Sequence, residues 1–160
     1  MNAYEQISLQ IPGEVERLME DRSILREDAQ KVILHAETTS RKLLNSATGH
    51  FLAFHRPKAV TYWAEYVRTG DDYRLVTAYS HRMAMKSSGS TQEWVKSGSG
   101  SEWLCNQCQA PLEEQTVRLQ YMQSIFPITL PACSGCGFIL VTEELATGKL
   151  AAAEQALEDK

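Results

Sequence analysis

The four cysteines of the chain stand as two CxxC pairs, Cys105 with Cys108 and Cys133 with Cys136, and twenty-four residues separate the pairs. A CxxC turn lets two thiolates converge on one ion, and two such turns supply the four sulfurs of a tetrahedral structural zinc site. Iron in a rubredoxin-like centre accepts the same four thiolates. The spacing therefore predicts a four-cysteine metal site, with zinc as the expected ion and iron as the alternative.

Three kinds of function fit such a site. The first is a structural zinc ribbon that stabilises a protein-docking module, and the second is a redox role through iron or through dithiol exchange. Dithiol exchange needs an exposed thiolate of low pKa, and no Lys, Arg or His lies within three residues of any cysteine. The third, a catalytic zinc site, needs an open coordination position that four thiolates do not leave. We therefore expect a non-catalytic accessory protein that binds another protein.

Composition supports a folded chain. Of 160 residues, 43% are hydrophobic and 22% are charged, which is ordinary for a globular protein. The sequence lacks both an apolar run long enough to cross a bilayer and a signal peptide at its start. A cytoplasmic location is the expectation, and paired CxxC turns in that compartment indicate metal or thiol chemistry rather than disulfides.

Charge divides the chain into two unequal parts. Residues 1–86 hold 12 Lys and Arg against 11 Asp and Glu, whereas residues 87–160 hold 4 against 9. All four histidines lie in the first part and all four cysteines in the second. A Gly/Ser-rich tract, typical of a flexible tether, separates them. The sequence predicts a domain over 1–86, a linker over 87–101 and a four-cysteine domain over 102–160.

The first domain is expected to hold two helices and then a β-meander. One helix follows Pro12, and the second spans Glu27–Glu37 with an apolar stripe at helical spacing. After Thr38 the period changes from 3.6 to 2, and four strands are expected, at 43–44, 51–55, 59–68 and 73–82. In the third strand both alternating faces carry apolar residues. Helices cover one face of such a sheet, so the other, with Tyr62, Tyr66 and Tyr79, is one candidate docking surface; the alternative is that these tyrosines belong to the core. The acidic helix from Glu143 to Asp159 is the second candidate surface.

Residues 12–85 resemble the small α+β domains related to BrnT and RelE toxins. The resemblance rests on three segments, namely 17–21, 61–66 and 76–83, placed along two helices and a meander. It implies a ribonuclease as a further alternative. The toxins of this family cut RNA with basic and aromatic residues on the sheet. In this chain the candidates for those roles are His55, Arg74, Tyr79, His81 and Arg82. A nearly neutral domain is poorly suited to binding phosphates, so a structural or interaction role is favoured and a nucleic-acid partner is not expected.

The second domain is expected to contain a strand over 116–122 and a return strand over 125–130. Pro127 cannot donate to a ladder, which predicts an edge strand or a bulge. A short buried strand over 138–141 should follow the second cysteine pair. Thr142 then caps a C-terminal helix, in which Gly148 is an unfavourable residue. The predicted fold class is α+β, a two-helix and antiparallel meander domain tethered to a zinc-ribbon-like domain with a C-terminal helix.

Residues 102–160 resemble a family of small bacterial proteins with two CxxC pairs that are labelled redox proteins. Four segments carry this resemblance: 103–108, 126–137, 143–149 and 157–160. It implies zinc-ribbon or rubredoxin-like character and a bacterial, anaerobic setting near radical enzymes. A protein partner from a redox or radical-enzyme system is therefore expected, and no membrane partner. The long first domain sets this chain apart from family members that consist of the cysteine domain alone.

Overall fold

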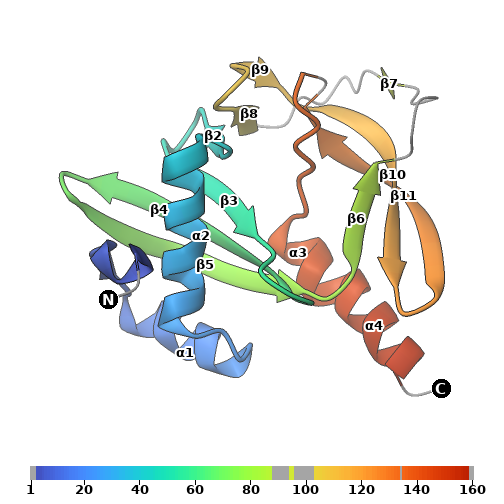
Figure 1. Ribbon diagram of the computed structural model, residues 1–160, viewed down its shortest axis with the longest axis horizontal. Helices are drawn as coiled ribbons and strands as arrows, with labels where there is room; N and C mark the ends of the chain where they lie inside the picture. Colours follow the sequence, from blue (N-terminus) through green and yellow to red (C-terminus); the bar gives the residue numbers. More distant parts are fainter. Residues whose placement is uncertain (1–2, 88–93, 96–102, 134, 159–160) are drawn as a thin grey trace.

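The computed structural model describes residues 3–87, 94–95, 103–133 and 135–158 (Figure 1). Most of the predicted linker, 88–93 and 96–101, lies outside these residues. The fold is α+β, as predicted, with helices, two β-sheets and four clustered cysteines. No described helix combines the length and apolar character that a membrane crossing requires.

The N-terminal helices form where the sequence predicts them. A 3₁₀ turn at Ala3–Gln6 precedes α1 (Gly13–Asp21) and α2 (Arg26–Thr39). The Asp28 carboxylate accepts a hydrogen bond from the Leu25 amide at 2.9 Å and so caps the start of α2. The predicted stripe of α2 is fully buried and consists of Ala29, Val32, Ile33 and Ala36.

The predicted meander is the centre of a seven-stranded sheet with the order β1-β5-β4-β3-β2-β8-β9. Only β1 pairs in parallel, with β5, and the other pairs are antiparallel. The strands are β1 (Leu9–Gln10), β2 (Leu43–Asn45), β3 (Phe51–His55), β4 (Thr61–Thr69), β5 (Asp72–His81), β8 (Trp103–Cys105) and β9 (Ala110–Pro111).

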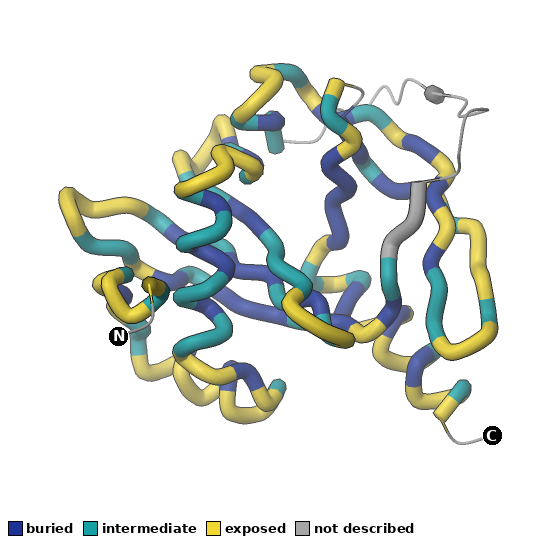
Figure 2. The backbone as a smooth tube through the Cα atoms, viewed as in Figure 1, coloured by how far each residue is buried: buried dark blue, intermediate teal, exposed yellow. Residues whose placement is uncertain are grey.

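Both faces of the meander are covered, so the expectation of an open face is wrong. On one face Tyr66 packs with the stripe of α2 and the buried residues of α1. On the other, Trp63 and Tyr79 pack with Phe138 and Val141 from the C-terminal part of the chain. Tyr66 and Tyr79 are only 0% and 2% exposed. Figure 2 shows the central strands of the meander largely in dark blue, the colour of buried residues. Alternation along a strand shows that both faces are apolar, but it does not say what covers them.

A second sheet lies beside the first. It has the order β11-β10-β6, and β7 also pairs with β10. Its strands are β6 (Ala84–Ser87), β7 (Trp94–Val95), β10 (Glu113–Tyr121) and β11 (Ser124–Ala132). Pro127 lies in β11 at the edge of this sheet, as predicted, where its missing amide hydrogen breaks no ladder.

The segment after the second cysteine pair is buried but is not a full strand. Phe138 to Val141 are all buried, yet only Ile139 forms a β-bridge, to Ala132. The predicted cap is present, since the Thr142 hydroxyl accepts from the Leu145 amide at 3.3 Å. The helix continues as α3 (Glu143–Leu145), a π-helical turn over Ala146–Leu150 and α4 (Ala151–Glu158). Gly148 lies inside the π turn.

The two parts of the chain share backbone pairing and an apolar core. Strand β8 extends the meander by pairing with β2, and β6 pairs with β10 (Figure 1). The Tyr79 hydroxyl donates to the Val141 carbonyl at 2.6 Å, and Arg22 forms an ion pair of 2.6 Å with Glu143. The charge division and the Gly/Ser tract do not predict these contacts. The domain boundaries at 86 and 102 stay a prediction from the sequence.

We expect the chain to stay associated after one cut in the predicted linker. A protease recognition sequence inserted between Gly98 and Ser99 provides the cut. Because strand pairing and a common core join the two parts, both fragments should leave a size-exclusion column together and separate only in denaturant. Two folded fragments that separate in plain buffer would support independent domains instead.

Candidate metal centre

The first CxxC pair lies in the turn between β8 and β9. Cys105 ends β8, and the register pairs it with Ala110 of β9. The Gln109 amide donates to the Cys105 carbonyl at 2.7 Å, and the Cys108 amide donates to the Cys105 sulfur at 3.4 Å. Gln109 has φ of 54°, in the left-handed region that glycine prefers. These hydrogen bonds close a tight turn, called here the first knuckle, with both sulfurs on the same side of it.

The second pair repeats this geometry. Cys133 follows β11, and the Gly137 amide donates to its carbonyl at 2.8 Å. Gly137 has φ of 81° and takes the position that Gln109 holds in the first knuckle. The Cys133 amide donates to the Phe138 carbonyl at 2.8 Å, which closes the turn. The two turns are therefore equivalent in backbone form, and the second carries the residue better suited to it.

All four sulfurs meet at one point. The Sγ atoms of Cys105, Cys108, Cys133 and Cys136 all lie within 4.8 Å of one another, and the Cys105 and Cys136 sulfurs are 3.5 Å apart. All four are free thiols. Zinc–sulfur bonds of about 2.3 Å in a tetrahedron place sulfurs roughly 3.8 Å apart. The cluster therefore has the ligand type, the ligand number and nearly the separation of a four-thiolate site, as the spacing predicts.

The cysteines differ in exposure. Cys105 and Cys133 are buried in the common core, Cys136 is half-buried and Cys108 is exposed. Cys105 is held in place from the meander, because it pairs with Leu43 of β2 and the adjacent Asn106 amide donates to the Lys42 carbonyl at 2.9 Å. The site is thus fixed by the first part of the chain as well as by the second.

Electrostatics in the cluster favour a cation. Hydrogen bonding with Cys133, followed by burial and the sulfurs of Cys136 and Cys105, raises the pKa of Cys108 to about 12. Burial also raises the pKa of Cys133, but the amides of Cys136 and Gly135 hydrogen-bond to its sulfur and the net pKa is lowered. Four thiols this close resist full ionisation because thiolates repel one another. A bound dication removes that repulsion and deprotonates the ligands.

One further residue is needed for the sulfurs to meet. A Cβ atom on Gly135 would lie 2.8 Å from the Cys108 sulfur and 3.7 Å from the Cys133 sulfur. Only glycine leaves room for the first knuckle to approach the second. The spacing of the cysteines alone does not predict this role of Gly135, although a glycine between two cysteines is itself a signal of close packing.

The five residues chosen from the resemblance to the toxins do not gather at one site in the fold. Arg74 and His81 stand near opposite ends of β5, roughly 23 Å apart at the usual rise of a strand. Tyr79 is buried, and Arg82 is exposed and pairs with Glu158. His55 lies in a separate hollow beside His35. These five residues do not form one site.

His81 is locked in its neutral form. The Trp63 indole donates to His81 Nε2 at 3.0 Å, so the proton is on Nδ1, which donates to the Met83 carbonyl at 2.8 Å. Burial lowers the pKa of His81 to about 4, although the Met83 hydrogen bond opposes this. Both ring nitrogens are occupied, and the ring is 3% exposed. His81 has the position of a core residue, with both ring nitrogens engaged inside the protein.

Residues 101–160 match a family described as a domain of unknown function (DUF7479). The match contains all four cysteines and covers less than half of the chain. No curated protein and no solved structure matches the chain. The family match therefore marks the range that carries the cysteine cluster and assigns no activity to it.

We expect Gly135→Ala to weaken metal binding. The added methyl group must push the Cys108 sulfur away, which should lower zinc affinity on the order of tenfold. Competition of the full-length protein against a chromophoric chelator measures the change. Gly148→Ala is the matched control, because a Cβ there meets nothing within 4 Å. Equal zinc affinities for both variants would show that the close approach of Gly135 to Cys108 is not required.

We expect His81 to stay neutral in the folded protein down to about pH 4. The unfolded chain takes up a proton near pH 6.5, and the folded chain does so only near its lowered pKa. The free energy of unfolding should therefore fall as pH drops from about 6.5 to 4, by about 3 kcal/mol at most. Imidazole NMR resonances and urea unfolding at several pH values measure both effects. His81→Gln should lack this part of the slope, and an imidazole that titrates near pH 6.5 would contradict the assignment.

Proposed function

We propose that the chain is a non-catalytic metal-binding accessory protein whose zinc ion is held by Cys105, Cys108, Cys133 and Cys136. The observation that supports this most directly is the convergence of four sulfurs from two equivalent knuckles. Zinc would supply a fixed tetrahedral link between β8 and the end of β11. Four thiolates complete its coordination, so the site has no position for a reacting water.

A structural role also fits the surroundings of the site. Two of the four cysteines belong to the core that joins the meander with the C-terminal part. Zinc bound by such ligands has apparent binding free energies of about 10–16 kcal/mol, which exceeds the net stability of many domains. The ion would therefore stabilise the common core as well as the knuckles.

Iron is the alternative ion, and the exposure of Cys108 supports it. Electron transfer needs a ligand near the surface, and Cys108 is exposed while the other three cysteines are buried or half-buried. Hydrogen bonds from amides to the sulfurs tune the potential of iron–thiolate centres, and the amides of Cys108, Gly135 and Cys136 form such bonds here. A rubredoxin-like electron carrier is thus the second candidate function.

Dithiol exchange is less well supported. It requires an exposed thiol that ionises easily. The exposed thiol, Cys108, has a raised pKa, and the thiol with a lowered pKa, Cys133, is buried. No cysteine of the cluster combines exposure with acidity.

We further propose that the protein works in the cytoplasm with a protein partner from a redox or radical-enzyme system. Of the three tyrosines expected on a docking surface, Tyr66 and Tyr79 are buried and Tyr62 is half-buried against the core, so they do not form an open surface. The tip of the β10–β11 hairpin is better placed, because Met122, Ile125 and Phe126 are exposed there. Large apolar side chains at an exposed tip are suited to a protein interface.

We expect protein purified without oxygen to contain one zinc ion per chain and to be colourless. Elemental analysis and the visible spectrum measure this directly. Red protein with iron–thiolate absorption would favour the electron carrier, and metal-free protein with reversibly cycling thiols would favour dithiol exchange. Chelation of the ion should lower the unfolding temperature of the whole described core, because Cys105 and Cys133 belong to it.

Two substitutions at Cys108 test whether its sulfur binds the metal ion or only packs against its neighbours. Cys108→Ser should release the ion, whereas Cys108→His should retain it because zinc accepts three cysteines and one histidine. Cys108 is the exposed member of the four, so a larger side chain is placed there with less disturbance of the core than at Cys105 or Cys133. Equal metal content and equal unfolding temperature in wild type and Cys108→Ser would overturn the structural site.

A further inference from the structure

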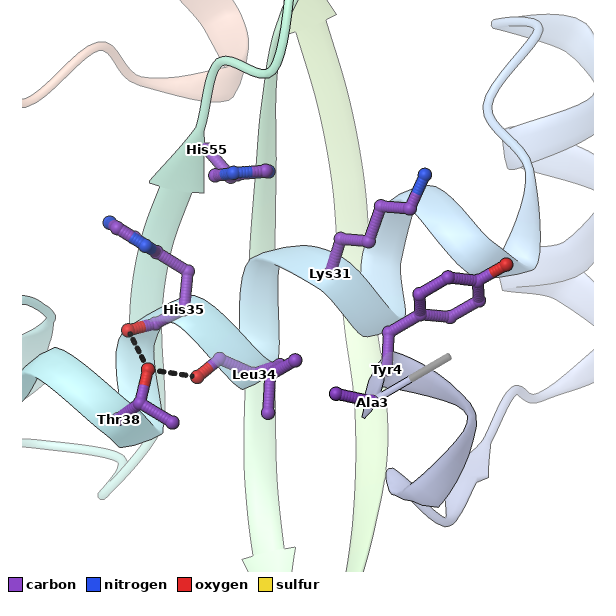
Figure 3. Close-up of a pocket in the computed structure, with 7 residues that line it drawn as sticks. All are labelled: Ala3, Tyr4, Lys31, Leu34, His35, Thr38 and His55. Carbon is purple, nitrogen blue, oxygen red and sulfur yellow. Dashed lines mark hydrogen bonds between the residues drawn. The ribbon is translucent and has the colours of Figure 1, made fainter. Parts of the chain in front are cut away.

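A hollow of about 620 Å³ lies along α2, between the N-terminal turn and the end of β3 (Figure 3). Its volume is within the roughly 300–1,000 Å³ that is usual for small-molecule sites. Lys31, Leu34 and His35 line it from α2, His55 from the end of β3 and Tyr4 from the N-terminal turn. Figure 3 shows the two imidazoles at one end and Lys31 with Tyr4 at the other.

The basic groups of this hollow have no counter-ion among the described residues. The His35 and His55 rings have centroids 5.1 Å apart, and neither ring forms a hydrogen bond with a described residue. The Lys31 ammonium lies 5.0 Å from the centroid of the Tyr4 ring and forms no ion pair with a described residue. No lining residue is acidic. Three basic side chains thus line one space, and the carboxylate of Glu27 borders it behind Tyr4, whose hydroxyl donates to Glu27 at 2.9 Å.

The pKa of His55 reflects the basic groups around it. Burial lowers the pKa of His55, and the charges of His35 and Lys31 lower it further. The lowered pKa leaves the His55 ring a neutral N–H donor at neutral pH, and the Lys31 ammonium supplies the positive charge of the hollow. This charge would attract an anion, although the whole chain has a net charge of −4.

The same hollow offers apolar surface. The Leu34 side chain lines its floor on α2, and the Tyr4 ring forms its wall beside Lys31 (Figure 3). We propose that the hollow binds a small organic anion, with its carboxylate at the imidazole end beside His35 and His55 and its apolar body against Leu34 and Tyr4. The Lys31 ammonium adds positive charge from the other end. This site is independent of the cysteine cluster.

The lining residues favour this ligand over two others. A metal ion would have only two imidazole ligands and would be repelled by the neighbouring Lys31. Inorganic phosphate would satisfy the basic groups but would leave the apolar surface of Leu34 and Tyr4 in water. An organic carboxylate satisfies both parts of the hollow.

Benzoate is the probe, and it is titrated into the full-length protein at neutral pH. Shifts of the His35 and His55 imidazole resonances report binding. We expect the neutral analogue benzamide and inorganic phosphate each to bind about tenfold more weakly or worse, because each lacks one of the two features. Binding of either as tightly as benzoate, or no response to benzoate at all, would overturn the proposal.

Lys31→Met tests the role of charge while it keeps the length of the side chain. We expect benzoate affinity to fall about tenfold in this variant and to stay unchanged in Lys149→Met, which removes an exposed charge from the C-terminal helix. His35→Gln gives a second test that does not depend on the folding of the Lys31 variant. Unchanged affinity in both site variants would contradict the proposed site.

Discussion

The meeting of the four sulfurs depends on the antiparallel return of β11 along β10. The register pairs Tyr121 with Ser124 at the tip of the hairpin and Glu113 with Ala132 at its base. Cys133 directly follows Ala132, so the base of the hairpin returns the chain to the strand that leaves the first knuckle. The long gap between the CxxC pairs is therefore a rigid ladder rather than a flexible loop. A formed ladder lowers the entropic cost of bringing the two cysteine pairs together.

The hairpin in turn depends on the meander. Strand β8 carries Cys105 and continues the meander sheet by pairing with β2, while β10 pairs with β6 at the end of the meander's chain. Each knuckle is thereby tied to a different edge of the same core. A change in the packing between the two parts of the chain would move one cysteine pair relative to the other. Metal binding therefore depends on how the two parts of the chain pack together.

Local patterns predicted the elements well. The α2 stripe, the four strands of the meander, Pro127 at an edge and the Thr142 cap follow from spacing and residue type, because each depends on neighbours within a few residues. The cysteine cluster was predictable for another reason: two CxxC turns are a known ligand set even when a long segment separates them. What covers the second face of the meander depends on contacts between residues far apart in the chain. The Phe138–Val141 segment shows the same limit, since it is apolar enough for a strand but finds only one bridging partner. The hollow beside His35 and His55 likewise needs a helix and a strand that only the fold brings together.

Buried polar contacts explain why the two parts of the chain meet in one arrangement. The Tyr79 hydroxyl donates to the Val141 carbonyl, and the Glu154 carboxylate accepts from the backbone amides of Arg82 at 3.0 Å and Met83 at 3.2 Å. In water each of these groups would find other partners, so the contacts add little net stability. In a misaligned core, however, each would be buried without a partner, at a cost of about 1–3 kcal/mol. Apolar burial thus drives the two parts together, and the polar groups select the alignment in which the cysteine pairs face each other.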